Sequence, residues 1–175
     1  MKGEGARPLL EALAAKKSAI VKEWLARTLR TYPEHTSRFL SQEQDPFCNP
    51  VGQILKEAFP ALFDRLVEGP DAATLSRLLD PIVRIRAVQD FSPAQAVGFI
   101  FLLKRVMQDA LQDELPRIPN GEGLAAVEAR IDEMALLAFD LFMKCREQIY
   151  EIRANEAKRR LFVLERMHEE RADAE

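Results

Sequence analysis

Asp140 is the residue whose position in the sequence is least expected for its chemistry. It interrupts an apolar segment that runs from Met134 to Met143 within a long predicted helix. A carboxylate buried in such a segment can orient a ligand or pair with a charged group across an interface. The simpler interpretation is an outward-facing Asp140 that pairs with Lys144, four residues further along the same helix. We favour the simpler interpretation and keep the functional one open.

Arg84, Arg86 and Asp90 form a second cluster of charged residues. Two arginines near a helix start can hold an anionic ligand, because guanidinium groups bind anions through paired N–H donors. Arg86 and Asp90 are four positions apart, however, so an ion pair between them at the helix end is the simpler interpretation. We expect the ion pair.

Aromatic residues at helical spacing are the third candidate. Trp24, Phe63, Phe99 and Phe139 can line an apolar ligand pocket, with Asp140 beside them. Aromatic residues in this pattern more often form an ordinary hydrophobic core. The sequence leaves both interpretations open.

The chain lacks the residue sets that catalysis and metal binding need. Its two histidines, His35 and His168, lie in segments that are not predicted to face a cavity. The sequence contains no glycine-rich phosphate-binding motif and no HExxH zinc motif. Cys48 and Cys145 form no CxxC motif, so we expect two free thiols in a cytoplasmic protein. We expect a protein that is not an enzyme and that has no cofactor and no metal.

The composition favours helices and excludes several classes of protein. Of the 175 residues, 47% are apolar and 30% are charged, which is enough for a packed core and for solubility. Alanine and leucine together number 45, against 22 for valine, isoleucine and threonine, and this excess favours helix over strand. The net charge of −3 argues against a nucleic-acid partner. The short apolar runs argue against membrane insertion.

Proline, glycine and capping residues divide the chain into about six helices. Ser92, Pro93 and Gln95 give the strongest local signal, a capping box with proline in the first turn. Asp80 followed by Pro81 predicts a break within the fourth helical segment. The core helices are predicted at residues 8–31, 50–68, 71–89, 93–113 and 122–145, with a short, weaker helix at 34–42.

The last helix is too long for the domain to which it belongs. From residue 124 to about Met167 the sequence has no proline or glycine, which predicts a helix of roughly 45 residues and about 68 Å. A compact domain of this size is only about 40 Å across. We therefore expect a sensor-like domain at 1–145 and a charged extension of the helix at 146–175, projecting as a stalk. Apolar residues three, four or seven positions apart form a seam through which two copies can pair: Ile131, Met134, Ala138, Leu141, Cys145 and Ile152.

The segment from Ile85 to Phe99 resembles a known family, the N-terminal domain of the RsbRD type, which is the sensory part of co-antagonists of the kinase RsbT. The residues that carry the similarity are Arg86, Gln89, Asp90, Ser92, Pro93 and Gln95. Supporting similarities lie at residues 31–33, 49–52, 138–140, 145–147 and 152–156, so the resemblance covers roughly residues 9–165.

The resemblance implies a haem-free, globin-like helical sensor domain that dimerises and takes part in stress signalling. In the family the last helix leads into a STAS domain, which contacts the kinase in a large assembly. This sequence shows no STAS domain after the long helix, so the resemblance supports sensing or docking and not kinase co-antagonism.

The leading hypothesis is a cytoplasmic, all-α regulatory module that is not an enzyme. It forms a homodimer through its last helix and responds to a small-molecule ligand or to a protein partner, through a shift between two packings of its helices. A parallel dimer along the seam brings the two Cys145 thiols together, whereas an antiparallel dimer does not. The alternative is a structural adaptor with a packed core and no ligand. Neither hypothesis includes nucleic acid or membrane insertion.

Overall fold

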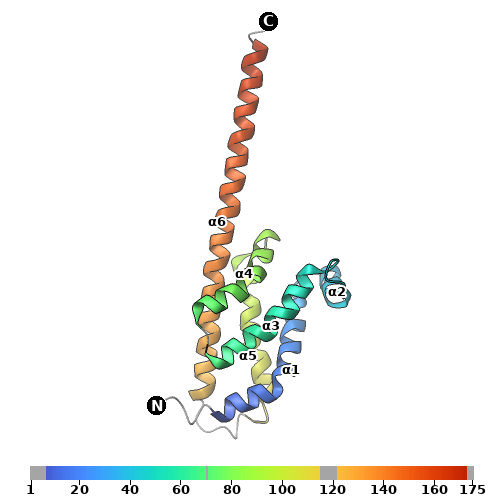
Figure 1. The fold of residues 1–175 in the computed structure, drawn as a ribbon, viewed down its shortest axis with the longest axis vertical. Coiled ribbons are helices and arrows are strands. Elements are labelled where there is room, and N and C mark those ends of the chain that lie inside the picture. The colour runs from blue at the N-terminus through green and yellow to red at the C-terminus, as the bar shows by residue number, and fades with distance from the viewer. Residues whose placement is uncertain (1–6, 70, 115–121, 173–175) are drawn as a thin grey trace.

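The computed structural model describes residues 7–69, 71–114 and 122–172, and within these ranges the chain forms six α-helices and no strand (Figure 1). The helices are α1 (Arg7–Leu29), α2 (Glu34–Gln42), α3 (Pro50–Glu68), α4 (Ala72–Val88), α5 (Pro93–Ala110) and α6 (Glu122–Ala172). The predicted all-α fold of about six helices with a long last helix is confirmed. Most of the loop predicted before the last helix, residues 115–121, lies outside the described residues.

Capping side chains set the starts of α3 and α5. Asn49 accepts a 2.8 Å hydrogen bond from the Gly52 backbone amide at the start of α3. At α5 the predicted capping box is present, because the Ser92 hydroxyl accepts from the Gln95 amide and the Gln95 side chain accepts from the Ser92 amide. These are local interactions, which is why the sequence alone predicts both helix starts.

The predicted break at Asp80 and Pro81 is wrong, because α4 continues through both residues. Leu79 and Ile82, which flank Asp80 and Pro81, are buried in the core. Helix α4 packs on both α3 and α6. Proline removes one backbone hydrogen bond and disfavours a helix interior. Tertiary packing on both sides outweighs that local cost here.

Helix α5 lies between α1 and α6 in the bundle (Figure 1). It packs on both of them, while α4 packs on α6 and α3, and α3 packs on α1. Phe99, Ile100 and Leu103 of α5 have no exposed surface. The apolar face of α5 therefore forms the middle of the core, against which the other helices are positioned.

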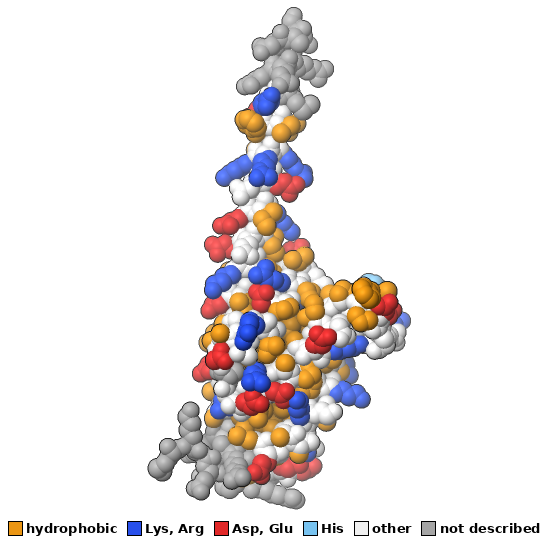
Figure 2. All heavy atoms as spheres, viewed as in Figure 1, with side chains coloured by type: hydrophobic (Ala, Val, Ile, Leu, Met, Phe, Trp, Pro, Cys, Tyr) orange, Lys and Arg blue, Asp and Glu red, His pale blue; other side chains and the backbone are white. Residues whose placement is uncertain are grey.

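Helix α6 extends well beyond the bundle. Its 51 residues correspond to about 77 Å at 1.5 Å per residue. Ile149 still packs against the core, whereas every residue from 151 to 166 is exposed. Figure 1 shows the second half of α6 projecting from the bundle, and Figure 2 shows charged and apolar side chains interspersed along it.

The seam predicted to pair two copies packs instead inside the chain's own domain. Four of its six residues are buried: Ile131, Met134, Ala138 and Cys145. Leu141 is half-buried, and Ile152 is 66% exposed. An apolar stripe that faces its own domain needs the same spacing as one that faces a second copy, so the sequence does not separate the two cases. In this conformation Cys145 is 8% exposed and packs in the core of its own domain.

Candidate functional site

Arg86, near the C-terminal end of α4, is a charged side chain with no exposed surface. Its Nη1 atom donates a 2.9 Å hydrogen bond to the backbone carbonyl oxygen of Gln95. Its Nε and Nη2 atoms are buried and have no hydrogen-bond partner. An unpaired buried donor destabilises a fold by roughly 1–3 kcal/mol, and burying the charge itself adds a further penalty. An apolar side chain of the same size would serve the core better.

Three aromatic rings surround the guanidinium group of Arg86. Its Cζ atom lies 5.1 Å from the ring centroid of Tyr32, 5.1 Å from that of Phe91 and 4.8 Å from that of Phe99. Burial lowers the pKa of Arg86 from its ordinary value, and the neighbouring Tyr32 hydroxyl opposes part of this decrease. The Tyr32 hydroxyl is itself buried without a hydrogen-bond partner. The rings attract the cation but do not satisfy its free N–H donors.

A groove of about 440 Å³ opens beside this cluster. It is formed by the residues after α1, the turn between α4 and α5, and the first turn of α5. We call it the motif groove, and its lining residues are Thr31, Tyr32, Pro33, Gln89, Asp90, Phe91 and Gln95. Tyr32, Phe91 and Gln95 each contact Arg86 as well, so they separate the groove from the guanidinium group.

Asp90 connects the motif groove to α6. Its backbone φ of 57° is a left-handed conformation that residues other than glycine seldom adopt. Its carboxylate accepts a 2.8 Å hydrogen bond from Nη1 of Arg146, and this bond lowers the pKa of Asp90. The same guanidinium donates to the Ala87 carbonyl oxygen at 3.2 Å and to the Tyr150 hydroxyl at 2.6 Å. Arg146 therefore joins the end of α4, the motif groove and the part of α6 where the bundle ends.

The predicted ion pair between Arg86 and Asp90 is wrong. Helix α4 ends at Val88, so the four-residue helical spacing does not extend to Asp90, whose carboxylate pairs with Arg146. Arg84 is exposed and pairs with Asp80 at 2.7 Å. Two arginines that are two residues apart thus have opposite environments, one in solvent and one in the core.

The structure does not bring the predicted aromatic pocket together. Trp24, Phe63 and Phe99 are buried core residues. The Trp24 Nε1 atom donates a 2.6 Å hydrogen bond to the backbone carbonyl oxygen of Phe99. Phe139 is 41% exposed, and Asp140 is exposed beside it. Asp140 is therefore not a buried carboxylate of this pocket, and it occupies the outward position of the simpler interpretation.

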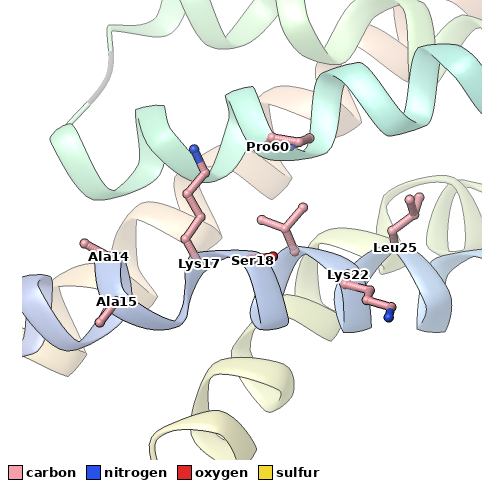
Figure 3. Close-up of a pocket in the computed structure, with 8 residues that line it drawn as sticks. Ala14, Ala15, Lys17, Ser18, Lys22, Leu25 and Pro60 are labelled. Atoms are coloured by element: carbon pink, nitrogen blue, oxygen red, sulfur yellow. The ribbon is translucent and has the colours of Figure 1, made fainter.

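A second groove, of about 590 Å³, lies between α1 and α3. Figure 3 shows Lys17 and Lys22 on the α1 side and Pro60 on the α3 side. Lys17 pairs with Asp64 at 2.6 Å. None of its lining residues carries a buried polar atom without a partner. The motif groove is the stronger candidate, because it is lined by Tyr32, whose buried hydroxyl has no partner, and lies next to Arg86.

The part of the chain that the structure describes contains neither a metal-binding cluster nor a helix that could cross a membrane. No cluster of three or more His, Cys, Asp or Glu side chains suited to a metal ion is found there. None of the described helices is long and apolar enough to cross a membrane. Cys48 is exposed and Cys145 is buried, and both are free thiols. His168 lies outside the residues whose side chains are described.

Tyr32, Phe91 and Arg146 belong to this site, although the sequence did not single them out as site residues. Each lies within a segment that carries the family resemblance, at residues 31–33, 85–99 and 145–147. The sequence does not show that these three distant segments meet at one groove, and this is why it did not identify the three residues as parts of a site. Ser92 and Pro93, by contrast, start α5 and do not line the groove.

Comparisons with known proteins agree with the motifs. Residues 18–157, most of the chain, match the family model of the RsbT co-antagonist protein rsbRD N-terminal domain. An uncharacterized protein of Archaeoglobus fulgidus is 28% identical over 147 residues, which cover 80% of this chain and 83% of that protein. No solved structure matches the chain. The family match includes the whole motif groove together with Arg86 and Arg146, and the chain belongs to the RsbRD N-terminal domain family.

Proposed function

We propose that this chain is a cytoplasmic signalling module that is not an enzyme, and that it works as a homodimer. Its input is the motif groove, and its output is the arrangement of the two α6 helices. The family is associated with stress-response signalling, which supports a regulatory role. No haem or other cofactor is required by this proposal.

The contacts of Arg146 carry the proposal. One guanidinium group binds Asp90 at the groove, the Ala87 carbonyl oxygen at the end of α4, and the Tyr150 hydroxyl on α6. Asp90 lies in the turn between α4 and α5 and has a left-handed backbone. A shift of this turn therefore changes the position of its carboxylate. A ligand that prefers one position of the turn changes the populations of the two arrangements. Arg146 provides the physical contact through which α6 responds.

The proposed second copy binds a face of α6 other than the predicted seam. Five exposed residues recur at every seventh position of α6, and we call them the heptad face: Leu136, Met143, Tyr150, Ala157 and Leu164. An apolar side chain at every seventh position supplies one of the two core positions of each heptad in a coiled coil. A second copy carries the same repeat, so the face is complementary to itself. Asp140 and Glu147 lie four residues after Leu136 and Met143, at the second core position of their heptads, where a carboxylate weakens the pairing.

Sedimentation equilibrium tests the proposed pairing. We expect the wild-type protein to have twice the mass of its 19.9 kDa chain at micromolar concentrations. Leu164→Glu places a charge on the heptad face and should give a monomer. Val163→Glu is the matched control, because Val163 is also 55% exposed but lies beside the face. A monomeric wild-type protein, or equal sensitivity to both substitutions, contradicts the proposed dimer.

A structural adaptor with no ligand is the second candidate function. The close packing of Trp24 and Phe99 in the core favours it, since the predicted aromatic pocket is filled by side chains. The two candidates differ at the motif groove. An adaptor has no ligand there, so small molecules would leave its oligomeric state and its stability unchanged.

A further inference from the structure

The two unpaired nitrogen atoms of Arg86 lie on the same edge of its guanidinium group. Nε and Nη2 are the pair that donates two parallel N–H bonds to one planar acceptor. The remaining nitrogen, Nη1, already donates to the Gln95 carbonyl oxygen. The unpaired atoms therefore form one complete binding edge, and they are not two unrelated defects of packing.

The surroundings of this edge suit a carboxylate. The rings of Tyr32, Phe91 and Phe99 surround the guanidinium, so an acceptor that reaches it is shielded from water and needs only a single charge to match the cation. The buried, unpaired Tyr32 hydroxyl offers one more donor. A phosphate dianion needs a second positive charge. The nearby Arg146 is already paired with Asp90, and Asp90 repels a dianion more strongly than a singly charged carboxylate.

We propose that Arg86 binds the carboxylate of a small organic acid whose apolar part lies in the motif groove. The volume of about 440 Å³ lies within the usual range for small-molecule sites. The role of this acid as the input signal rests on the function proposed above. The binding of the acid to Arg86 does not rest on that function, and calorimetry measures this binding separately.

Binding displaces the rings that separate the groove from Arg86. Tyr32 and Phe91 meet edge to face with ring centroids 5.2 Å apart, and both contact the guanidinium. Phe91 directly follows Asp90, so moving its ring acts on the left-handed turn that holds Arg146. The acid thereby supplies the hydrogen-bond acceptor that Arg86 lacks, and it also shifts the contact between Asp90 and Arg146 of α6.

Isothermal titration calorimetry with sodium benzoate tests the site. Benzamide has nearly the same shape without the charge, and inorganic phosphate tests the other anion class. We expect the wild-type protein to bind benzoate at least about tenfold more tightly than benzamide or phosphate. Arg86→Met should remove this preference. Arg84→Met, which removes an exposed arginine from the same helix, should retain it. Tyr32→Phe should weaken benzoate binding severalfold.

Several results would overturn the carboxylate site. They are the absence of benzoate binding at millimolar concentrations, equal affinity for benzoate and benzamide, tighter binding of phosphate, and unchanged binding by a folded Arg86→Met variant. Circular dichroism checks the fold of each variant. If Arg86→Met does not fold, unchanged benzoate affinity in Tyr32→Phe overturns the proposal. Benzoate binding by a monomeric protein would support the site and contradict the dimer, so the two proposals fail separately.

Discussion

Replacing Arg86 with methionine separates a functional role of the buried charge from a structural one. Methionine keeps the unbranched apolar stem of arginine, so Arg86→Met retains part of the packing near Tyr32, Phe91 and Phe99 while it removes the charge and the N–H donors. If Arg86 is present to hold the fold together, its removal should destabilise the protein. If it is present to bind a ligand, the fold should tolerate methionine.

The structure gives the expected magnitude. Arg86→Met loses one charged hydrogen bond, about 1.5–3 kcal/mol, and the attraction of three rings, up to about 2 kcal/mol each. It also removes two unpaired buried donors, about 1–3 kcal/mol each, and the remaining desolvation penalty of the charge. The space left by the smaller methionine adds a further loss, so the losses and gains nearly cancel. We therefore expect a free energy of unfolding within about 2 kcal/mol of the wild-type value.

Urea unfolding, followed by circular dichroism and by the fluorescence of Trp24, the only tryptophan of the chain, measures this difference. Arg86→Ala leaves a cavity and should be about 2–5 kcal/mol less stable than Arg86→Met. Arg84→Met, at an exposed position, should leave the free energy of unfolding almost unchanged. If Arg86→Met is destabilised as much as Arg86→Ala, the charge itself supports the fold, and the reasoning that assigns Arg86 to a ligand is refuted.

The remaining predictions concern the elements around the site. Asn49→Ala removes a buried side chain that caps α3 and donates to two backbone carbonyl oxygens, so urea unfolding should show a loss of about 2–4 kcal/mol. Gly52→Ala places a Cβ against the Asn49 side chain and should destabilise the same cap by at least about 2 kcal/mol, with no effect expected if the cap is unimportant. Trp24→Phe loses a buried hydrogen bond and should lower stability by about 1–3 kcal/mol in the same assay. Arg146 lowers the pKa of Asp90, so their contact stabilises the fold above the ordinary Asp pKa of 3.8. This stability is lost as the pH falls through the lowered pKa. Urea unfolding at several pH values should therefore show a smaller acid dependence for Asp90→Asn than for the wild-type protein.

Local interactions are the part of the fold that the sequence predicts well. Ser92 and Gln95 cap α5 through bonds between neighbours in the chain, so their residue types and spacing are sufficient evidence. Pro81 shows the limit of local reasoning. Its tendency to break a helix is real, but the burial of Leu79 and Ile82 on either side decides the outcome, and burial depends on other helices.

The orientation of α6 was not predictable for a related reason. Ile131, Met134 and Ala138 have the spacing of a helix face that must be covered, but the sequence does not state what covers it. The bundle itself covers that face. The heptad face, displaced around the same helix, remains exposed and includes Leu136 and Leu164.

The candidate site combines a local motif with contacts between distant segments. The sequence placed Arg86, Gln89 and Asp90 in one motif, and Gln89 and Asp90 line the groove. It also predicted an ion pair that the left-handed turn at Asp90 rules out. Tyr32 and Arg146 complete the site from opposite ends of the chain, and only the packing of α1, α4 and α6 brings them to it.

The dimer dissociation constant, measured by sedimentation equilibrium with and without saturating benzoate, tests most directly whether the groove is coupled to α6. If the two sites share a coupling free energy, benzoate must shift that constant, and we expect a shift of at least about fivefold. At a benzoate concentration that saturates each variant, Arg146→Met should abolish the shift, and Arg160→Met, on the exposed extension, should preserve it. A dissociation constant that benzoate leaves unchanged in the wild-type protein, although benzoate binds, would contradict the coupling.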